Sequence, residues 1–159
     1  MEIEKKYLVC RTPEHLEGYD HSRMEQGYLN QKPVMRIRKT DEEYCFTYKS
    51  KREAACADPV CINHEVELPL SREAYEHLRE KIDGCMIEKT RYRIPDGPYT
   101  IELDVFHGKY EGMILAEVEF PTEQEAQAYV PPDWFGENVS GDYRYTNASL
   151  ALTGLSGFL

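Results

Sequence analysis

The sequence predicts a mainly β protein of the α+β class, with antiparallel strands and a few flanking helices. Three observations lead to this prediction. Eight short runs alternate between polar and apolar residues with the period of two that is typical of strands. Turn residues such as Asp96-Gly97-Pro98 separate neighbouring runs, and only short stretches carry helix signals. A chain of 159 residues can bury a core of its own, so we expect a single domain over residues 1–159.

The eight predicted strands cover most of the chain. Two pairs are expected to form hairpins, because only the short turns at 41–43 and 96–98 separate their strands. A loop of small residues is expected at 52–61. The strands are expected at residues 2–9, 24–30, 34–40, 44–51, 62–68, 85–94, 99–106 and 113–120.

Three of the predicted helical segments are short. One begins near Thr12, an expected N-cap that Pro13 follows at the first helical position. Another spans 122–130, where Thr122 and Glu125 have the spacing of a capping box. The third is a terminal segment at 148–152.

The longest predicted helix runs from Ser71 to about residue 82. Ser71 is a favourable N-cap residue, and Gly84 is expected to stop the helix. Tyr75, Leu78 and Ile82 recur at helical spacing. We interpret this apolar stripe as a contact with the core of the protein.

The charge and the N-terminal residues narrow the classes of function. A formal net charge of −10 argues against a general nucleic-acid binder and against an acidic membrane surface as partner. It still allows an anionic substrate, provided that the basic residues are gathered in one place. The N-terminus is charged without an apolar signal segment, and there is no run of about 18 apolar residues. We therefore expect a cytoplasmic protein.

The cysteines and histidines do not form a recognisable metal motif. Five cysteines are an odd number, and none of them form a Cys-x-x-Cys pair. We expect reduced thiols and no structural zinc. Cys56 and Cys61 lie close together in the predicted loop, so a disulfide or a weak metal site there is the alternative. The five histidines are scattered, without His-x-x-x-His spacing.

The first predicted strand shows what chemistry the charged residues could support. Glu2, Glu4 and Lys6 share one face of it. Carboxylates two residues apart on a strand are separated by roughly 6.5–7 Å along the backbone. Side chains of this length can converge on one hard cation, which prefers oxygen ligands. The lysine would then attract an anion bound to that cation. A solvated face with mixed charges is the alternative interpretation of this short stretch.

Charged faces recur on the other predicted strands. The strands are acidic or basic in blocks, and Glu-x-Glu or Glu-x-Asp occurs four times. The acids are Glu2, Glu4, Glu65, Glu67, Glu102, Asp104, Glu117 and Glu119. The bases are Lys6, Arg36, Arg38, Lys49, Lys51, Lys89, Arg91 and Arg93.

Two architectures agree with this pattern. In one, the apolar faces of the strands pack into a core and the charged faces meet solvent, as is usual for an antiparallel sheet. In the other, the sheet closes into a barrel whose charged faces point inward. Buried charges are costly, so the second arrangement requires that they pair with one another or with a ligand. A polyanion with bound divalent cations would satisfy charges of both signs. The blocks of like charge and the recurrence of Glu-x-Glu or Glu-x-Asp favour this second arrangement.

The order of the motifs resembles that of the CYTH, or triphosphate tunnel metalloenzyme, family. The chain opens with Glu2-Ile3-Glu4-Lys5-Lys6, which is similar to the Glu-x-Glu-x-Lys signature of the family. Thr146 is a departure, because related sequences often carry a lysine there; Arg144 is a candidate substitute. The further motifs are Gln26-Gly27-Tyr28-Leu29, Arg36-Ile37-Arg38, Thr47-Tyr48-Lys49, Glu65-Val66-Glu67, Lys89-Thr90-Arg91-Tyr92, Glu102-Leu103-Asp104, Glu117-Val118-Glu119 and Asp142-Tyr143-Arg144-Tyr145-Thr146-Asn147.

The resemblance implies a fold and an activity. The implied fold is a closed antiparallel eight-stranded β-barrel tunnel with a few flanking helices. The implied activity is hydrolysis of the terminal phosphoanhydride of inorganic tripolyphosphate or of nucleoside triphosphates, with Mg²⁺ or Mn²⁺ as cofactor. The sequence looks most like the bacterial tripolyphosphatase branch. A class IV-type adenylate cyclase, a thiamine triphosphatase and a non-enzymatic polyphosphate-binding module remain alternatives.

The resemblance also implies roles for individual residues. A second group of carboxylates, together with Lys6, is assigned to catalysis, where the carboxylates would hold a second metal or orient the attacking water. The implied metal ligands are Glu2, Glu4, Glu117 and Glu119. The implied substrate-binding residues are Lys6, Arg36, Arg38, Lys49, Lys89, Arg91 and Arg144. The implied catalytic residues are Lys6, Glu65, Glu67, Glu102 and Asp104.

Overall fold

The structure, a computed structural model, describes residues 1–52 and 59–154. Within these ranges the chain forms nine strands and three α-helices, together with three 3₁₀ turns. The strands are β1 (Glu2–Val9), β2 (Asp20–Gln31), β3 (Val34–Thr40), β4 (Glu43–Arg52), β5 (Cys61–Pro69), β6 (Asp83–Asp96), β7 (Tyr99–Phe106), β8 (Ile114–Glu119) and β9 (Phe135–Asn138). The α-helices are α1 (Arg72–Arg79), α2 (Glu123–Ala128) and α3 (Asn147–Leu152), and the 3₁₀ turns are η1 (Leu16–Gly18), η2 (Gly108–Tyr110) and η3 (Tyr143–Tyr145).

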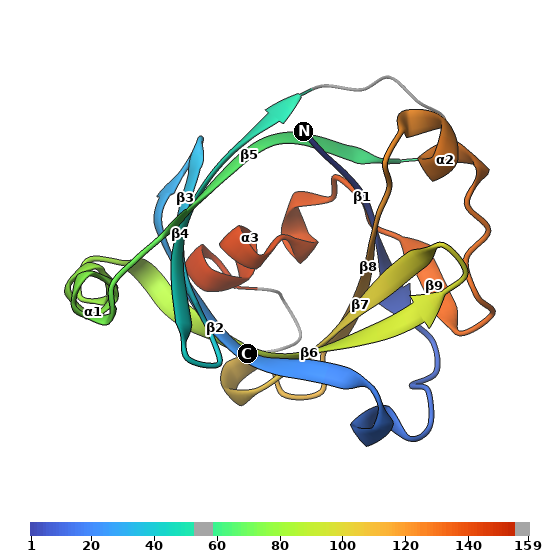
Figure 1. The fold of residues 1–159 in the computed structure, drawn as a ribbon, viewed down its shortest axis with the longest axis horizontal. Helices are drawn as coiled ribbons and strands as arrows, with labels where there is room; N and C mark the ends of the chain where they lie inside the picture. The colour runs from blue at the N-terminus through green and yellow to red at the C-terminus, as the bar shows by residue number, and fades with distance from the viewer. Residues whose placement is uncertain (53–58, 155–159) are drawn as a thin grey trace.

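Eight of the strands close into an antiparallel barrel (Figure 1). Neighbours around the ring follow the order β5-β4-β3-β2-β6-β7-β8-β1, and pairing of β1 with β5 completes it. The closing register is short and joins Glu2 to Asn63 and Glu4 to Cys61. Beyond Glu4, β1 no longer pairs with β5, and from Tyr7 onward it pairs with β9 instead. The predicted fold class, a mainly β protein built on a closed antiparallel eight-stranded barrel, is confirmed.

Most strands turn charged side chains into the barrel and apolar side chains outward; β2 is an exception, because Met24 and Tyr28 line the cavity there. On β1, Glu4 and Lys6 line the interior cavity, whereas Ile3 and Tyr7 belong to an apolar cluster outside the wall. Since successive side chains of a strand point to opposite faces, this alternation follows directly from the sequence. Of the two architectures that the sequence allows, the structure has the barrel with inward-facing charges.

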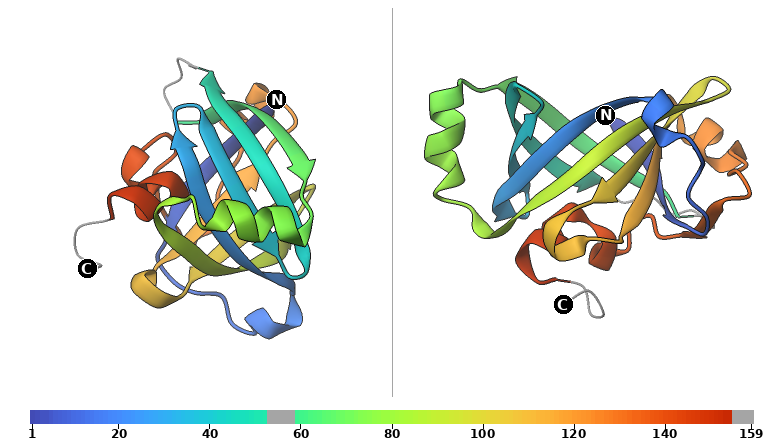
Figure 2. Two further views of the ribbon diagram at one scale, coloured as in Figure 1. Left: turned by 90° about the vertical axis from the view of Figure 1, so that its left-hand side faces the viewer. Right: turned by 90° about the horizontal axis from the view of Figure 1, so that it is seen from below.

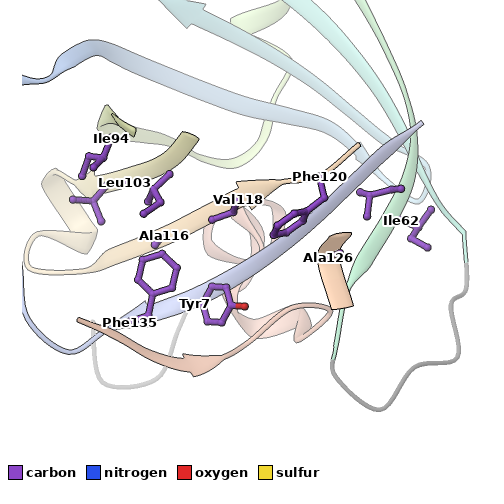
Figure 3. Close-up of a cluster of buried hydrophobic side chains, with 11 residues drawn as sticks. Tyr7, Ile62, Ile94, Leu103, Ala116, Val118, Phe120, Ala126 and Phe135 are labelled. Carbon is purple, nitrogen blue, oxygen red and sulfur yellow. The ribbon is translucent and has the colours of Figure 1, made fainter. Parts of the chain in front are cut away.

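The main apolar cluster lies against the outer face of the wall formed by β1, β7 and β8 (Figure 3). Leu103 and Val118 from this wall are fully buried in the cluster. Ala126 of α2 and Phe135 of β9 cover them from outside, and the rings of Phe135 and Tyr7 lie 4.8 Å apart. The wall is therefore a layer between a charged interior and an apolar exterior that other elements shield from water.

The C-terminal segment lies at one end of the barrel (Figure 2), where a second apolar cluster holds it. Leu150 of α3 is fully buried in this cluster, and its carbonyl oxygen accepts a 2.7 Å hydrogen bond from the hydroxyl group of Tyr110. Gly84, with φ of +66°, lets β6 approach α3 closely, because a Cβ atom at this position would lie 2.1 Å from the carbonyl oxygen of Ala151. Contacts with β6 and η2 thus hold α3 in place.

The helix caps are predicted correctly more often than the helix lengths. The hydroxyl groups of Ser71 and Thr122 accept hydrogen bonds from backbone N–H groups in the first turns of α1 and α2. However, α1 ends at Arg79 and α2 at Ala128, before the predicted ends. Gly84 lies within β6 rather than at a helix end, and Ile82 follows α1. Tyr75 is fully buried, as its predicted core contact requires.

The helix predicted near Thr12 is wrong. Only the 3₁₀ turn η1 forms in this region, and His15 precedes it in a left-handed conformation without a side-chain cap. The signal of Thr12 and Pro13 is a local preference that no apolar stripe supports, and packing decides the conformation of so short a segment.

Several strand boundaries also differ from the predictions. β2 begins at Asp20, four residues before the predicted start, and β9 was not predicted at all. Arg52 and Cys61 belong to strands, while residues 53–58, including Cys56, lie outside the described part of the chain. The described cysteines Cys10, Cys45, Cys61 and Cys85 are free thiols.

Among the described residues, no helix combines the length and the apolar character needed to cross a membrane.

The burial of Leu150 leads to a prediction about stability. Leu150→Ala should lower the free energy of unfolding by about 2–5 kcal/mol, because it leaves a cavity where α3 meets the barrel. The control is Val130→Ala, whose side chain is 83% exposed and should change stability by less than about 0.5 kcal/mol. Urea denaturation monitored by circular dichroism measures both, and equal midpoints for the two variants would contradict this role of α3.

Candidate active site

A cavity of about 960 Å³ occupies the inside of the barrel. Side chains from all eight barrel strands line it; the segment before α3 contributes Gly141 and Thr146, and α3 itself contributes Asn147. The charged residues reach it because they occupy alternate positions on their strands. The lining residues include Glu2, Glu4, Lys6, Arg36, Arg38, Lys49, Lys51, Glu65, Glu67, Arg91, Arg93, Glu102, Glu117 and Glu119.

Three carboxylates converge on one part of the cavity wall. Oxygen atoms of Glu2, Glu4 and Glu119 all lie within 4.8 Å of one another. Glu2 and Glu4 are in phase on β1, and Glu119 stands directly opposite Glu4 in the pairing of β1 with β8. Glu2 and Glu4 were expected to converge from one strand, and the family resemblance implied Glu117 and Glu119 as further metal ligands. The register of β1 with β8 brings Glu119 to this pair.

Glu4 and Glu119 of this cluster, and the neighbouring Glu65, hold protons more tightly than isolated carboxyl groups do. Burial and the nearby charge of Glu117 raise the pKa of Glu4 to about 8. Burial and repulsion from Glu102 and Glu2 raise the pKa of Glu119 to about 7. Burial and a hydrogen bond with Glu2 raise the pKa of Glu65 to about 7. Several acids thus share too little positive charge for all of them to ionise easily.

Glu2 differs from its neighbours because Lys49 lies beside it. The Nζ atom of Lys49 is 2.6 Å from Oε1 of Glu2 and 3.9 Å from Oε1 of Glu4. Burial opposes ionisation of Glu2, but the attraction of Lys49 outweighs it, so the pKa of Glu2 is lowered. Asn63 donates a 3.0 Å hydrogen bond to the same oxygen of Glu2. Glu2 therefore loses its proton at a lower pH than Glu4 and Glu119 do.

Glu117 has a different environment from the three converging carboxylates. Its Oε1 atom lies 3.3 Å from Nζ of Lys6, and its Oε2 atom lies 3.8 Å from Nη2 of Arg91. Burial alone would raise its pKa, but these cations hold the pKa of Glu117 well below its ordinary value. Glu117, predicted as a metal ligand, is thus placed among bases, next to the carboxylate cluster.

Arg36 lies within the cavity wall with part of its guanidinium group unused. Its Nη2 atom donates a 3.0 Å hydrogen bond to the hydroxyl group of Thr47 and lies 3.8 Å and 3.7 Å from oxygens of Glu65 and Glu67. Among the described residues, the buried Nε atom of Arg36 has no hydrogen-bond partner. An unpaired buried donor is costly, so an acceptor in the cavity would stabilise it.

Arg91 is surrounded by carboxylates. Its Nε and Nη2 atoms donate to the two oxygens of Asp104 at 2.7 Å and 2.9 Å, and Nη1 donates to Glu102 at 2.7 Å. Lys89 donates to the same Asp104 at 2.7 Å and to Asn147 at 3.2 Å. Burial alone would raise the pKa of Asp104, but Arg91 and Lys89 lower it. This buried network joins β6, β7 and α3.

Three of the predicted site residues do not line the cavity. Lys89 and Asp104 are almost fully buried in the wall, beneath Arg91. Arg144 lies in the turn η3 with a largely exposed side chain that pairs with Asp142 at 2.7 Å. The suggestion that Arg144 replaces the basic residue missing at Thr146 therefore has no support in its geometry, whereas Thr146 itself lines the cavity.

Several neutral residues of the site were not among the predicted site residues. Asn63 contacts Glu2, Thr47 contacts Arg36, and Gln26 contacts Arg38. Asn63 lies in phase with Glu65 on a predicted strand, so its inward direction could have been inferred. A neutral amide offers no charge pattern, however, and its partner across the barrel depends on a register that the sequence does not reveal.

Two inorganic triphosphatases are similar to this chain in sequence over most of its length. The chain matches no protein-family model. An inorganic triphosphatase of Nitrosomonas europaea is 39% identical over 158 residues, covering 96% of this chain and 97% of that protein. An inorganic triphosphatase of Acetivibrio thermocellus is 32% identical over 151 residues, covering 94% of this chain and 92% of that protein.

Solved structures show the same fold. The crystal structure of an inorganic triphosphatase matches 96% of this chain and 95% of its own, with a TM-score of 0.68 and 36% identity. A Hippeastrum protein with a dominant triphosphatase activity matches 80% of this chain and 83% of its own, with a TM-score of 0.53. At 16% identity, the second match concerns the fold alone. The family resemblance seen in the motifs is confirmed, and the chain belongs to the inorganic triphosphatase family.

Proposed function

We propose that this protein hydrolyses the terminal phosphoanhydride bond of inorganic tripolyphosphate, with Mg²⁺ or Mn²⁺ as cofactor. The observation that carries the proposal is the convergence of Glu2, Glu4 and Glu119 in a cavity that Arg36 and Lys49 also line. Carboxylates and bases in one enclosed space match a cation bound to a polyanion. The two relatives named as inorganic triphosphatases support the same substrate class.

The residues present fit a hard divalent cation. Glu2, Glu4 and Glu119 offer only oxygen donors, which Mg²⁺ and Mn²⁺ prefer. The raised pKa values of Glu4 and Glu119 indicate that this cluster lacks positive charge. These three residues would hold the cation, which when bound would offset negative charge on the phosphate oxygens.

The basic residues of the cavity would bind the triphosphate. Arg36 and Arg38 lie on β3, which is four strands away from β8 around the ring of eight and therefore faces Glu119. Lys6 and Lys49 lie nearer to the carboxylates. Guanidinium groups can fork onto phosphate oxygens, whereas ammonium groups act as compact charges. The substrate would thus lie between the acidic and the basic side of the barrel.

Catalysis would come from positioning and charge stabilisation. Water would attack the terminal phosphorus atom while the anhydride bond breaks, releasing phosphate and pyrophosphate. Glu65 is the best placed member of the second carboxylate group to orient this water, because it borders Glu2 and its pKa of about 7 lets it exchange a proton near neutrality. Glu102 and Asp104 hold Arg91 instead.

One assay tests the proposed function. Release of phosphate and pyrophosphate is measured with tripolyphosphate, ATP and thiamine triphosphate, each with Mg²⁺, with Mn²⁺ and with excess chelator. We expect tripolyphosphate to be hydrolysed at least as well as ATP, because the predicted binding residues recognise phosphate and no motif for reading a base was found. Chelation should abolish the reaction, since the cavity acids would then lack their cation.

Each contrary result selects another function. Undiminished hydrolysis in chelator would contradict the metal assignment. Formation of cyclic AMP from ATP would favour an adenylate cyclase, and a clear preference for thiamine triphosphate would favour a thiamine triphosphatase. Binding of tripolyphosphate without hydrolysis of any triphosphate would leave a polyphosphate-binding module.

The raised pKa values predict that metal binding depends on pH. The folded protein keeps protons on Glu4 and Glu119 up to pH values of about 8 and about 7, whereas ordinary glutamates have lost them. Without metal, stability should therefore fall as the pH rises from about 5 to about 8. A cation must displace these protons, so its affinity should rise about tenfold per pH unit for each displaced proton.

Melting curves with and without Mn²⁺ measure this linkage. The increase in melting temperature on adding Mn²⁺ should be larger at pH 8.5 than at pH 6, with free Mn²⁺ held constant. The Glu119→Gln variant should show a smaller increase at pH 8.5. An increase that is larger at pH 6 would contradict the assignment of these carboxylates.

A further inference from the structure

The guanidinium group of Arg38 is held by an amide rather than by an acid. Its Nε atom donates to Oε1 of Gln26 at 3.0 Å, and its Nη2 atom donates to the same oxygen at 2.8 Å. Gln26 and Arg38 are directly paired across β2 and β3, so the register fixes this contact. Gln26 is fully buried, while Arg38 lines the cavity.

The orientation of the Gln26 amide is itself fixed. Its Nε2 atom donates a 2.8 Å hydrogen bond to the hydroxyl oxygen of Tyr28, which lies in phase with it on β2. The amide oxygen is thereby directed at Arg38. Tyr28 is also buried and borders the cavity. The three side chains form one hydrogen-bonded series, Tyr28–Gln26–Arg38. Its two acceptors, the hydroxyl oxygen of Tyr28 and the amide oxygen of Gln26, are both uncharged.

Arg91, on the neighbouring strand β6, is held in the contrasting way. Asp104 and Glu102 accept hydrogen bonds from its Nε, Nη1 and Nη2 atoms, and their negative charges compensate its positive charge. By contrast, within residues 1–52 and 59–154 no carboxylate oxygen lies within 4.0 Å of a nitrogen atom of Arg38. Burial and the nearby charges of Arg36 and Arg91 lower the pKa of Arg38 to about 10. The protein therefore compensates its charge only in part, through carboxylates such as Asp104 that lie more than 4.0 Å away.

We propose that Gln26 is a positioning residue, which orients Arg38 for the triphosphate without neutralising it. The amide occupies the Nε and Nη2 side of the guanidinium group, adds no negative charge of its own, and leaves Nη1 for a phosphate oxygen. A carboxylate at this position would hold the same geometry but cancel the charge, as Asp104 does for Arg91. This inference rests on the proposed function, since it takes tripolyphosphate as the ligand.

The Gln26→Glu variant separates geometry from charge. Glutamate has the shape of glutamine and can accept the same bonds from Arg38, while the Tyr28 hydroxyl can turn to donate to its second oxygen. If Gln26 only supported the fold, activity would stay near that of the wild type. Because Arg38 would lose its free charge, we expect kcat/KM for tripolyphosphate to fall roughly ten- to hundred-fold.

A matched control and a second readout accompany this variant. Gln31→Glu makes the same change at an exposed position of the same strand, outside the cavity lining, and should stay within about twofold of the wild type. KM should carry most of the effect of Gln26→Glu, with kcat less affected. Without divalent cations, tripolyphosphate should raise the melting temperature of the wild type and of Gln31→Glu more than that of Gln26→Glu.

A double-mutant cycle tests the inference without placing a new charge in the barrel. Gln26→Met, Arg38→Met and the double variant are compared, since Met has a similar length and needs no hydrogen bond. If Gln26 acts through Arg38, Gln26→Met should lower kcat/KM in the wild type but change it less than twofold when Arg38 is already Met. If the two substitutions instead lower kcat/KM by independent factors that multiply in the double variant, the inference is overturned.

The outcomes distinguish this inference from the proposed function. A wild-type protein that neither binds nor hydrolyses tripolyphosphate would overturn the proposed function, and the inference with it. An active wild type, together with a folded Gln26→Glu variant of unchanged KM, would overturn the inference alone. If Gln26→Glu does not fold, the cycle with methionine decides.

Discussion

The structure depends on how the charges inside the barrel are compensated. Taking an ion out of water costs several kcal/mol, and leaving it without a partner is strongly destabilising. The barrel nevertheless directs charged side chains inward from seven of its eight strands, with β2 as the exception. Part of the solution is internal, because Arg91 and Lys89 share Asp104, and Lys6 pairs with Glu117. These pairs let the wall fold around a polar interior.

The remaining charges are compensated only in part, and they define the site. Glu4 and Glu119 keep raised pKa values, which indicates a deficit of positive charge on their side. On the side of β3, Arg38 is oriented by an amide, and the buried Nε atom of Arg36 has no partner in the described chain. A divalent cation and a polyanion would complete both sides together. The folded protein is thus prepared for its ligands at some cost to its own stability.

The apolar residues stabilise the barrel from outside. Because the interior is polar, apolar burial must come from the outer wall and from the end that α3 closes. Phe135 of β9 and Ala126 of α2 cover the outer face of β1 and β8 (Figure 3). The fixed wall then keeps the register in which Glu119 stands beside Glu4, so the apolar exterior determines the geometry of the acidic cluster.

Sequence alternation was sufficient to predict all eight barrel strands and which side chains share a face, because period two is a local property. Alternation alone could not choose between a solvated sheet and a closed barrel, since both have the same alternation. The grouping of the charges in acidic and basic blocks, the recurrence of Glu-x-Glu and the family motifs favoured the barrel. Alternation missed β9, a four-residue strand without clear alternation, and it missed the role of Gln26, which depends on its pairing with Arg38. The family resemblance implied Glu2, Glu4 and Glu119 as metal ligands, but alternation alone could not show that the register of β1 with β8 places Glu119 opposite Glu4.

The central claim is that the converging carboxylates bind the cation that the triphosphate requires. Calorimetric titration of Mn²⁺ into the wild type and into Glu4→Gln at pH 8 tests it most directly. We predict saturable binding to the wild type and at least a tenfold weaker affinity for Glu4→Gln, with an unchanged or raised melting temperature because the amide resembles the protonated acid. Equal Mn²⁺ affinity for both proteins would contradict the account.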